Sequence, residues 1–449
     1  MEIPIRPPTL AEVFKSFDDS HRSPRLTEIF ALGLGPAPGG KYRHWDTLRH
    51  LKPPEGLSSQ EWWAGIKVAR SLTRREVPLL KDKTGGSFFY TLADPVLELL
   101  HEIDRNASGH IAVADQITNP QTRDRYIQSS LIEEAITSSQ LEGASTTREK
   151  AKEMLRSGRE PIDHSEKMIV NNYRAIQLIA RLKDQPLSKE LLSLFHRTII
   201  NGTLKEGTER NYLRQPGDGI GVYDNRDNTL LHEPPPAHHI PGRIDALCRF
   251  ANETPTGTFL HPVLKAIILH FWLAYDHPFI DGNGRTARVL FYWSVLSQHF
   301  WLFEFLSIST ILRKAPVKYA RSFLYTETDE NDLTYFILAQ LQVIRRAINE
   351  LYAYVERKRQ EVQQIEYLLR ASTLLNHRQM ALLGHALRHP GMRYTIESHR
   401  TSHQITYQTA RTDLLELVKR QLLHHRKIAR TFVFTVPPDL AERVQRLSS

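Results

Sequence analysis

Residues 277–288 bring together, in twelve consecutive positions, the groups that chemistry on a nucleoside triphosphate requires. The segment reads His-Pro-Phe-Ile-Asp-Gly-Asn-Gly-Arg-Thr-Ala-Arg. His277 can take a proton from an attacking hydroxyl group near neutral pH. Asp281 offers the oxygen ligand that a phosphate-bound Mg²⁺ prefers. A single histidine or carboxylate is more often a packed or capping residue, but this ordered combination predicts a catalytic site.

The second half of the segment is suited to binding phosphate groups. Gly282 and Gly284 let the backbone turn tightly, so that successive N–H groups converge on an anion. A helix that begins near Gly284 adds partial positive charge at the same place. Arg285 and Arg288 are three residues apart, so they share one face of the first turn and can bind further phosphate oxygens.

Two apolar segments flank this loop and must position it. Residues 266–275 carry only one strongly polar side chain, His270, and residues 289–293 read Val-Leu-Phe-Tyr-Trp. Both segments predict buried helices. A polar, glycine-bearing loop between two core helices is a rigid position for an active site.

At these residues the chain resembles the Fic family (filamentation induced by cyclic AMP), whose signature is His-Pro-Phe-x-Asp/Glu-Gly-Asn-Gly-Arg-x-x-Arg. Every specified position is matched. The resemblance implies a mainly α-helical core with a β-hairpin flap. It also implies AMPylation, the transfer of AMP from ATP to a Ser, Thr or Tyr hydroxyl of a target protein. It makes His277 the general base and Asp281 the Mg²⁺ ligand. The implied ATP-binding residues are Gly282, Asn283, Gly284, Arg285, Thr286, Ala287 and Arg288.

A second motif lies far upstream. Residues 129–143 predict an amphipathic helix, since their apolar residues fall largely at helical spacing. Gly143 is suited to end that helix. Thr146 and Glu149 predict a capping box for the next helix. On this evidence alone, a glutamate in the last turn is one more surface carboxylate.

The end of this helix also carries a pattern that resembles a regulatory motif. Ser138-x-x-x-Glu142-Gly143 is similar to the inhibitory motif Ser/Thr-x-x-x-Glu-Gly/Asn of regulated Fic proteins. The resemblance implies that Glu142 pairs with Arg288. A carboxylate there occupies the room and the charge that the γ-phosphate of ATP would use. Because positioning supplies most of the catalysis in such chemistry, we expect inhibition within the same chain.

The stretch between the two motifs predicts a β-hairpin. Short apolar runs at 220–223 and 229–232 surround an Asn/Asp turn at 224–228, and residues 211–214 lead into them. In Fic relatives a flap at this place holds the target side chain. The glycines of 217–221 do not form a dinucleotide fingerprint, because Val222 stands where the third glycine belongs. The Gly-x-x-x-x-Gly-Lys-Ser/Thr loop of P-loop enzymes is also missing from the sequence.

Length and composition agree with a soluble multidomain protein. The 449 residues suffice for two or three domains with their own cores. The one cysteine, Cys248, excludes an internal disulfide and fits a reducing compartment. The first residues lack the apolar core of a signal peptide, and no apolar run approaches about 20 residues. We therefore expect a cytoplasmic protein without a membrane span.

We divide the chain into four parts, with boundaries at residues 1–120, 121–330, 331–370 and 371–449. The first is a helical extension, with helical patterns at 61–72 and 95–103, and the second holds the inhibitory helix and the catalytic core. Tyr319 lies where Fic relatives carry an adenine-pocket pair of aromatic residues, although only one aromatic is present here.

The third part is a long linker helix. From Leu333 onward its apolar residues alternate by four and three, as in a coiled-coil seam. These residues are Ile337, Leu341, Ile344, Ile348, Leu351 and Val355. The seam predicts either packing on the chain's own core or a homodimer interface.

The last part, 371–449, carries 12 Lys and Arg residues against 5 Asp and Glu. Helices are predicted at 379–387, within 394–403 and at 405–423. A basic segment at 426–430 and a strand at 431–434 follow, which completes a winged helix-turn-helix. Such charge suits contact with a nucleic-acid backbone. Winged domains also bind proteins or dimerise, so all of these partners stay open.

Two classes of function remain from the sequence. One is an adenylyltransferase restrained by Glu142, and the other is a DNA-binding regulator whose nucleotide site is a sensor. The intact His277 favours the enzyme, because sensing needs the phosphate-binding residues but no base. Removal of AMP from a modified protein, or transfer of another phosphate-containing group, is compatible with the same signature.

Overall fold

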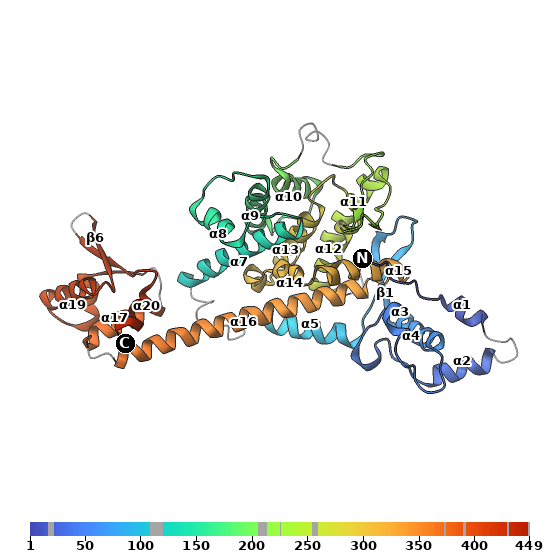
Figure 1. Cartoon of the computed structure of the whole chain (residues 1–449), viewed down its shortest axis with the longest axis horizontal. Helices are drawn as coiled ribbons and strands as arrows, with labels where there is room; N and C mark the ends of the chain where they lie inside the picture. The colour runs from blue at the N-terminus through green and yellow to red at the C-terminus, as the bar shows by residue number, and fades with distance from the viewer. Residues whose placement is uncertain are drawn as a thin grey trace. The chain divides into compact units, whose positions relative to one another are not determined.

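The computed structural model describes residues 1–16, 22–107, 120–204, 213–224, 226–253, 259–371, 374–388, 392–428 and 431–447. The chain is mainly α-helical with small sheets, as predicted (Figure 1). It divides into two compact units. The first comprises Met1–Gly109 and Ser130–Ile348, and the second His110–Ser129 and Asn349–Ser449. The N-terminal extension and the predicted catalytic core thus share one unit.

Two helices at the centre of the first unit, α12 (Pro262–Asp276) and α13 (Asn283–Ser297), correspond to the buried segments predicted around the loop. His261 caps α12 by accepting a hydrogen bond from the Val263 N–H at 3.1 Å. Because α12 is apolar on nearly every face, it is buried all round. The neighbouring helices are α9 (His164–Leu182), α10 (Lys189–Ile200), α11 (Ile240–Asn252), α14 (Ile308–Lys314) and α15 (Pro316–Thr328).

The predicted inhibitory segment belongs to a longer helix, α7 (Pro120–Leu141), which precedes α8 (Arg148–Ser157). Glu134 anchors α7, because its buried carboxylate accepts hydrogen bonds from the Ser309 N–H and the Ser307 hydroxyl at 3.0 and 2.9 Å. The capping box predicted at Thr146 is wrong by one residue. Thr147 caps α8, since its extended backbone lets the side chain accept from the Lys150 N–H.

The predicted hairpin is present as β3 (Val222–Tyr223) and β4 (Leu230–His232), which pair antiparallel. Val222 lies opposite His232, and Tyr223 lies opposite Leu230. Asn225 of the predicted turn, and Asn211 and Tyr212 before it, lie outside the described residues.

The N-terminal part confirms the helical patterns at 61–72 and 95–103 as α4 and α5. Its elements are α1 (Leu10–Lys15), α2 (Arg22–Ala31), α3 (Trp45–Leu48), α4 (Ser59–Thr73), β1 (Arg74–Lys81), β2 (Ser87–Thr91) and α5 (Asp94–Ala107). Strands β1 and β2 form an antiparallel ribbon that the sequence did not predict. Three short 3₁₀ turns lie elsewhere in the unit, at Pro38–Gly40, Ala237–His239 and Trp301–Phe305.

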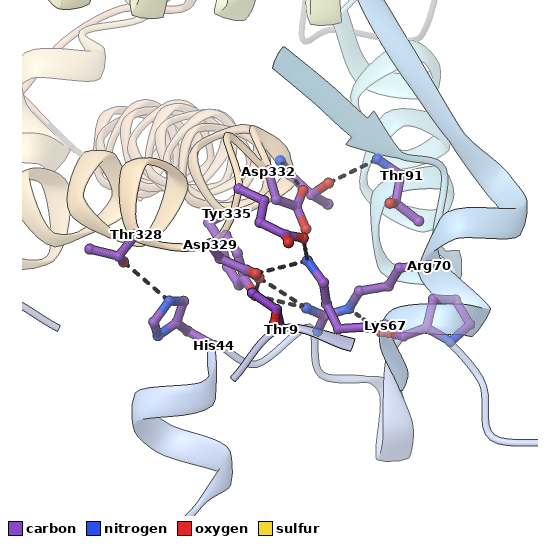
Figure 2. Close-up of polar contacts among 12 residues, drawn as sticks. Thr9, His44, Lys67, Arg70, Thr91, Thr328, Asp329, Asp332 and Tyr335 are labelled. Atoms are coloured by element: carbon purple, nitrogen blue, oxygen red, sulfur yellow. Dashed lines mark hydrogen bonds and ion pairs between the residues drawn. The ribbon is translucent and has the colours of Figure 1, made fainter. Parts of the chain in front are cut away.

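A buried ionic network joins α4 to the turn between α15 and the next helix, α16 (Thr334–Ala371) (Figure 2). The Lys67 ammonium donates to Asp329 Oδ1 at 2.8 Å, and the Tyr335 hydroxyl donates to Asp329 Oδ2 at 2.7 Å. The Arg70 guanidinium lies 3.7 Å from the same carboxylate. Because Asp329 is only 1% exposed, this pairing is what makes its burial as an anion tolerable. The N-terminal extension is therefore tied to the core by charge as well as by apolar packing.

The long linker helix is α16 (Thr334–Ala371). Its first apolar positions, Ile337, Leu341, Ile344 and Ile348, are at most 2% exposed. These four belong to the core of the first unit. Of the two roles predicted for the seam, these positions therefore have the first, which is packing on the chain's own core.

The second unit ends in a domain of helices around a three-stranded sheet of order β5-β7-β6. Its elements are α17 (His377–Arg388), β5 (Arg393–Thr395), α18 (Ile396–His403), α19 (Tyr407–Lys419), β6 (His424–Ile428), β7 (Thr431–Thr435) and α20 (Leu440–Leu447). The helix predicted at 405–423 is shorter than expected, because Thr406 caps its start and Gln421 adopts a left-handed conformation after its end. In the described part of the chain, no helix is long and apolar enough to cross a membrane.

Candidate active site

His277 follows the last residue of α12 in a left-handed conformation, with φ of 45°. Its N–H donates to the Leu273 carbonyl at 3.0 Å, and its ring Nδ1 lies 3.2 Å from the Ala274 carbonyl oxygen. Because a carbonyl oxygen only accepts, Nδ1 carries the hydrogen, which leaves a lone pair on Nε2 of the neutral ring. Burial lowers the pKa of His277 to about 4. The ring is thus neutral at pH 7 and ready to accept a proton.

Two residues from the hairpin region hold the end of α12 in place. His232 of β4 lies with Nε2 at 2.7 Å from the Tyr275 carbonyl, and with Nδ1 at 2.8 Å from Glu327 Oε2. Arg214 donates from Nε to the His277 carbonyl at 2.8 Å and from Nη2 to the Asp276 carbonyl at 3.1 Å. These contacts satisfy carbonyl groups that a helix end leaves without a partner. The same groups fix the position of His277.

The loop after His277 is held by its own side chains and by a second histidine. The Asn283 amide accepts from the Phe279 N–H at 3.0 Å and donates to the Phe279 carbonyl at 2.8 Å. His196 of α10 stacks on the Phe279 ring, with centroids 3.6 Å apart, and its Nε2 lies 2.9 Å from the Asp281 carbonyl. Sequence analysis did not single out His196, Arg214 or His232, because no motif or spacing marks them.

Asp281 presents a half-exposed carboxylate at the entrance of the loop. One oxygen accepts from the Gly282 N–H at 2.6 Å, and the other lies 3.3 Å from Arg285 Nη2. Among the described residues no group of three or more His, Cys, Asp or Glu side chains could hold a metal by itself. Mg²⁺ is commonly bound by one or two carboxylates together with substrate phosphates. Asp281 therefore fits a Mg²⁺ ion that arrives with a nucleotide.

The first turn of α13 presents main-chain N–H groups. Gly282 caps the helix with φ of 80°, a conformation that favours glycine. The first intrahelical bond runs from the Thr286 N–H to the Gly282 carbonyl at 2.9 Å, so the N–H groups of residues 283–285 precede the helical ladder. The side chains of Thr286 and Ala287 are fully buried. The Thr286 hydroxyl donates to the Gly282 carbonyl at 2.8 Å, which supports the first turn.

Arg288 and Glu142 form the ion pair that the resemblance implied. Arg288 Nη2 donates to Glu142 Oε1 at 2.8 Å. The Arg288 guanidinium also donates to the Ser138 hydroxyl at 2.9 Å and to the Ser138 carbonyl at 3.0 Å. A Cβ atom added at Gly284 would collide with Glu142 Oε1. The Glu142 carboxylate thus lies against the first turn of α13, where an anionic ligand of that turn would lie.

The two ends of this ion pair differ in exposure. The Arg288 side chain is 2% exposed, whereas that of Glu142 is 34% exposed. Burial opposes the charge on Glu142, but the Arg288 guanidinium outweighs it and lowers the pKa of Glu142 below its ordinary value of 4.5. Both groups are therefore charged at neutral pH.

Tyr319 lies on α15, and its hydroxyl is 2.8 Å from His270 Nε2. Its ring contacts Phe323 and Phe336, with centroids 5.3 and 6.3 Å away. Burial raises the pKa of Tyr319 to about 12, and the nearby Arg288 charge opposes that rise. Tyr319 is therefore a neighbour of the Arg288 guanidinium and part of an aromatic cluster.

Comparison with known proteins identifies the segment that carries this geometry. Residues 186–295 match the model of the Fic/DOC family. This segment is therefore similar to a Fic/DOC domain. It includes α10 to α13, the hairpin, His277 and both arginines, whereas Glu142 and Tyr319 lie outside it. The sequence alone had pointed to the same family through residues 277–288.

Two curated relatives match short stretches of the chain. The Protein adenylyltransferase Fic of Drosophila yakuba is 42% identical over 59 residues, which are 13% of this chain and 12% of the relative. The protein of the same name from Nematostella vectensis is 61% identical over 31 residues, 7% of each chain. The chain thus spans about an eighth or less of the length of these relatives.

A solved structure extends the likeness in fold. A Fic family protein from Desulfovibrio desulfuricans G20 matches 78% of this chain and 98% of its own, with a TM-score of 0.52 and 19% identity. The likeness shows that the helical arrangement around the Fic/DOC domain is shared.

Proposed function

We propose that the protein transfers AMP from ATP to a hydroxyl side chain of a target protein. One observation carries the proposal: a neutral histidine with a free Nε2 lone pair follows α12, and a helix N-terminus with two arginines follows it within the same loop. The histidine is suited to act as a base, and the helix N-terminus with its two arginines is suited to bind phosphate groups. The names of the curated relatives, which match only in part, support the same reaction.

The reaction balances with these groups. The target oxygen attacks the α-phosphorus of ATP, and His277 Nε2 takes the hydroxyl proton. The bond from the α-phosphorus to the bridging oxygen of the β-phosphate breaks, and pyrophosphate leaves. The N–H groups of residues 283–285 and the guanidinium groups of Arg285 and Arg288 hold the negative charge of the phosphates. Asp281 would hold Mg²⁺, which neutralises phosphate charge when bound.

We infer that Glu142 restrains this activity. Its carboxylate is bound to Arg288 and lies on Gly284, so it occupies part of the proposed phosphate site. ATP that binds beside it places its α-phosphate poorly for in-line attack. A displacement of about 1 Å is enough to slow such a reaction about a hundredfold.

The deciding experiment incubates the protein with ATP labelled at either the α- or the γ-phosphate. We use Glu142→Gly as the test protein, together with Glu142→Gly/His277→Ala. Label retained on protein from the α position only, and lost with His277→Ala while ATP still binds, supports AMP transfer. Label from the γ position contradicts AMP transfer and indicates phosphoryl transfer. Equal α-label with and without His277 contradicts its role as the base.

A further inference from the structure

Every carboxylate in residues 374–447 already belongs to an ion pair. The five pairs are Asp413–Arg378, Glu397–Arg400, Glu416–Arg420, Asp439–Arg443 and Glu442–Arg446, with distances between 2.5 and 3.6 Å. Five of the arginines are neutralised in this way. The excess positive charge of this domain therefore belongs to its other cations.

Besides Arg388 at the end of α17 and Arg393 on β5, the remaining described cations concentrate on two elements. Arg411 and Lys419 lie on α19, and Arg426 and Lys427 lie on β6. All four are exposed, and in the described part of the chain none of them pairs with a carboxylate. Exposed cations without a carboxylate partner keep their charge available for a polyanion.

The outward face of α19 is mainly polar, with Glu416, which is paired with Arg420, beside it. Gln408, Arg411, Thr412 and Lys419 recur at helical spacing and are exposed. The opposite face is fully buried in the domain core through Ala410, Leu414 and Leu417. A hydrophobic core on one side and hydrogen-bond donors on the other is the pattern of a helix that presents its outer face to a partner.

We propose that α19 and the β6–β7 hairpin bind duplex DNA. An α-helix fits the major groove of B-form DNA, where Arg and Gln side chains read base edges. The major groove of an RNA duplex is too deep and narrow for such a helix. Figure 1 shows the hairpin with β6 extending from the helices of this domain, and Arg426 and Lys427 on β6 are exposed. We assign Arg411 and Gln408 to base edges, and Lys419, Arg426 and Lys427 to phosphates.

The test measures binding of the full-length chain to a labelled DNA duplex of about 30 base pairs by fluorescence anisotropy. The three cations assigned to phosphates, Lys419, Arg426 and Lys427, predict a slope of log K against log salt of about −2.7. Arg426→Gln/Lys427→Gln should reduce the slope by about 1.8 and weaken binding at least about tenfold near 50 mM salt. Arg411→Gln/Lys419→Gln removes one phosphate contact, so it should reduce the slope by about 0.9. It should also weaken any preference for one DNA sequence over another.

The matched control is Arg443→Gln/Arg446→Gln, which removes the same amount of charge from two paired arginines on α20. We expect it to keep nearly the wild-type slope. Three results would overturn the proposal: no binding to the duplex near 50 mM salt, equal weakening in all three double variants, or tighter binding to an RNA duplex of the same length. Binding is measured without ATP, so the outcome is independent of the proposed catalysis.

Discussion

Two of the buried groupings of arginine with carboxylate in the described part of the first unit differ in construction. Around Asp329, both carboxylate oxygens accept hydrogen bonds, from Lys67 and from Tyr335, and Arg70 lies beside them (Figure 2). Around Arg288 it is the cation that has several partners: its guanidinium donates two hydrogen bonds to Ser138 and one to Glu142. The Glu142 carboxylate makes one hydrogen bond to Arg288 and is a third exposed.

This difference indicates which of the two ion pairs can break while the arginine keeps other hydrogen bonds. Arg288 keeps its two hydrogen bonds to Ser138 when Glu142 leaves, so the guanidinium stays in position for a phosphate. Asp329 has no such alternative, because Lys67, Arg70 and Tyr335 would each lose a partner. The charges around Asp329 also interact with each other: Lys67 and Arg70 lower the pKa of Asp329, whereas burial and the Asp329 charge raise the pKa of Asp332. We interpret the first grouping as structural and the second as a removable restraint.

The largest expected effect is on stability. Asp329→Asn removes the buried carboxylate that faces both Lys67 and Arg70, while Glu330 stays 2.9 Å from Lys67, so we expect a loss of about 3–5 kcal/mol in the free energy of unfolding. Glu142→Gln should cost less than about 1 kcal/mol, because its ion pair is partly exposed. Urea denaturation followed by circular dichroism compares the two. Equal losses would remove the distinction between the groupings.

A smaller loss is expected from Tyr335→Phe, which deletes only the hydroxyl that donates to Asp329. A hydrogen bond to a charged group is worth about 2 kcal/mol. The same denaturation measurement applies, with Tyr325→Phe on α15 as the control, since Tyr325 has no hydrogen bond to Asp329. A change as small as that of the control would show that Lys67 alone satisfies the carboxylate.

The third effect is on activity. Glu142→Gly should raise incorporation of α-label about tenfold, which corresponds to about 1.4 kcal/mol in the activation barrier, with little change in ATP affinity. Glu142→Asp should give an intermediate rate, because its shorter side chain reaches Arg288 poorly. Glu149→Gly on α8 is the control, as it removes a carboxylate away from Arg288. Unchanged labelling by Glu142→Gly would mean that the ion pair does not restrain turnover.

The smallest effect is expected from pH. The pKa of Glu142 is lowered from 4.5 and that of His277 to about 4, so the restraint and the base are lost only as pH falls toward those values. Between about pH 5.5 and about pH 8 we expect a constant ratio of Glu142→Gly to wild-type labelling and no decline near 6.5, the ordinary pKa of histidine. Labelling rates across this range measure both. A decline centred near 6.5 would place His277 in a solvated environment.

Some features of the site around His277 depend on neighbours in the sequence, and others depend on segments far away in the sequence. The loop of 277–288, its two buried helices and the turn at Gly282 follow from residue types and spacing, because each depends on neighbours in sequence. The contacts of Arg214, His196 and His232 do not follow, since they depend on where the hairpin and α10 pass the loop. The ion pair of Glu142 with Arg288 was expected from a family motif and not from spacing, because nothing local joins residues so far apart.

The sequence by itself determined the groups on which the proposed chemistry rests: the histidine, the carboxylate, the glycine-bearing turn with its arginines, and the basic C-terminal domain. Those features are written in side-chain types and in short periodic patterns. Only the tertiary structure decided which charges are buried and which are free. It placed Asp329 among three donors and Glu142 on Gly284. Burial and counter-charge are properties of the packed chain, so no local pattern in the sequence specifies them.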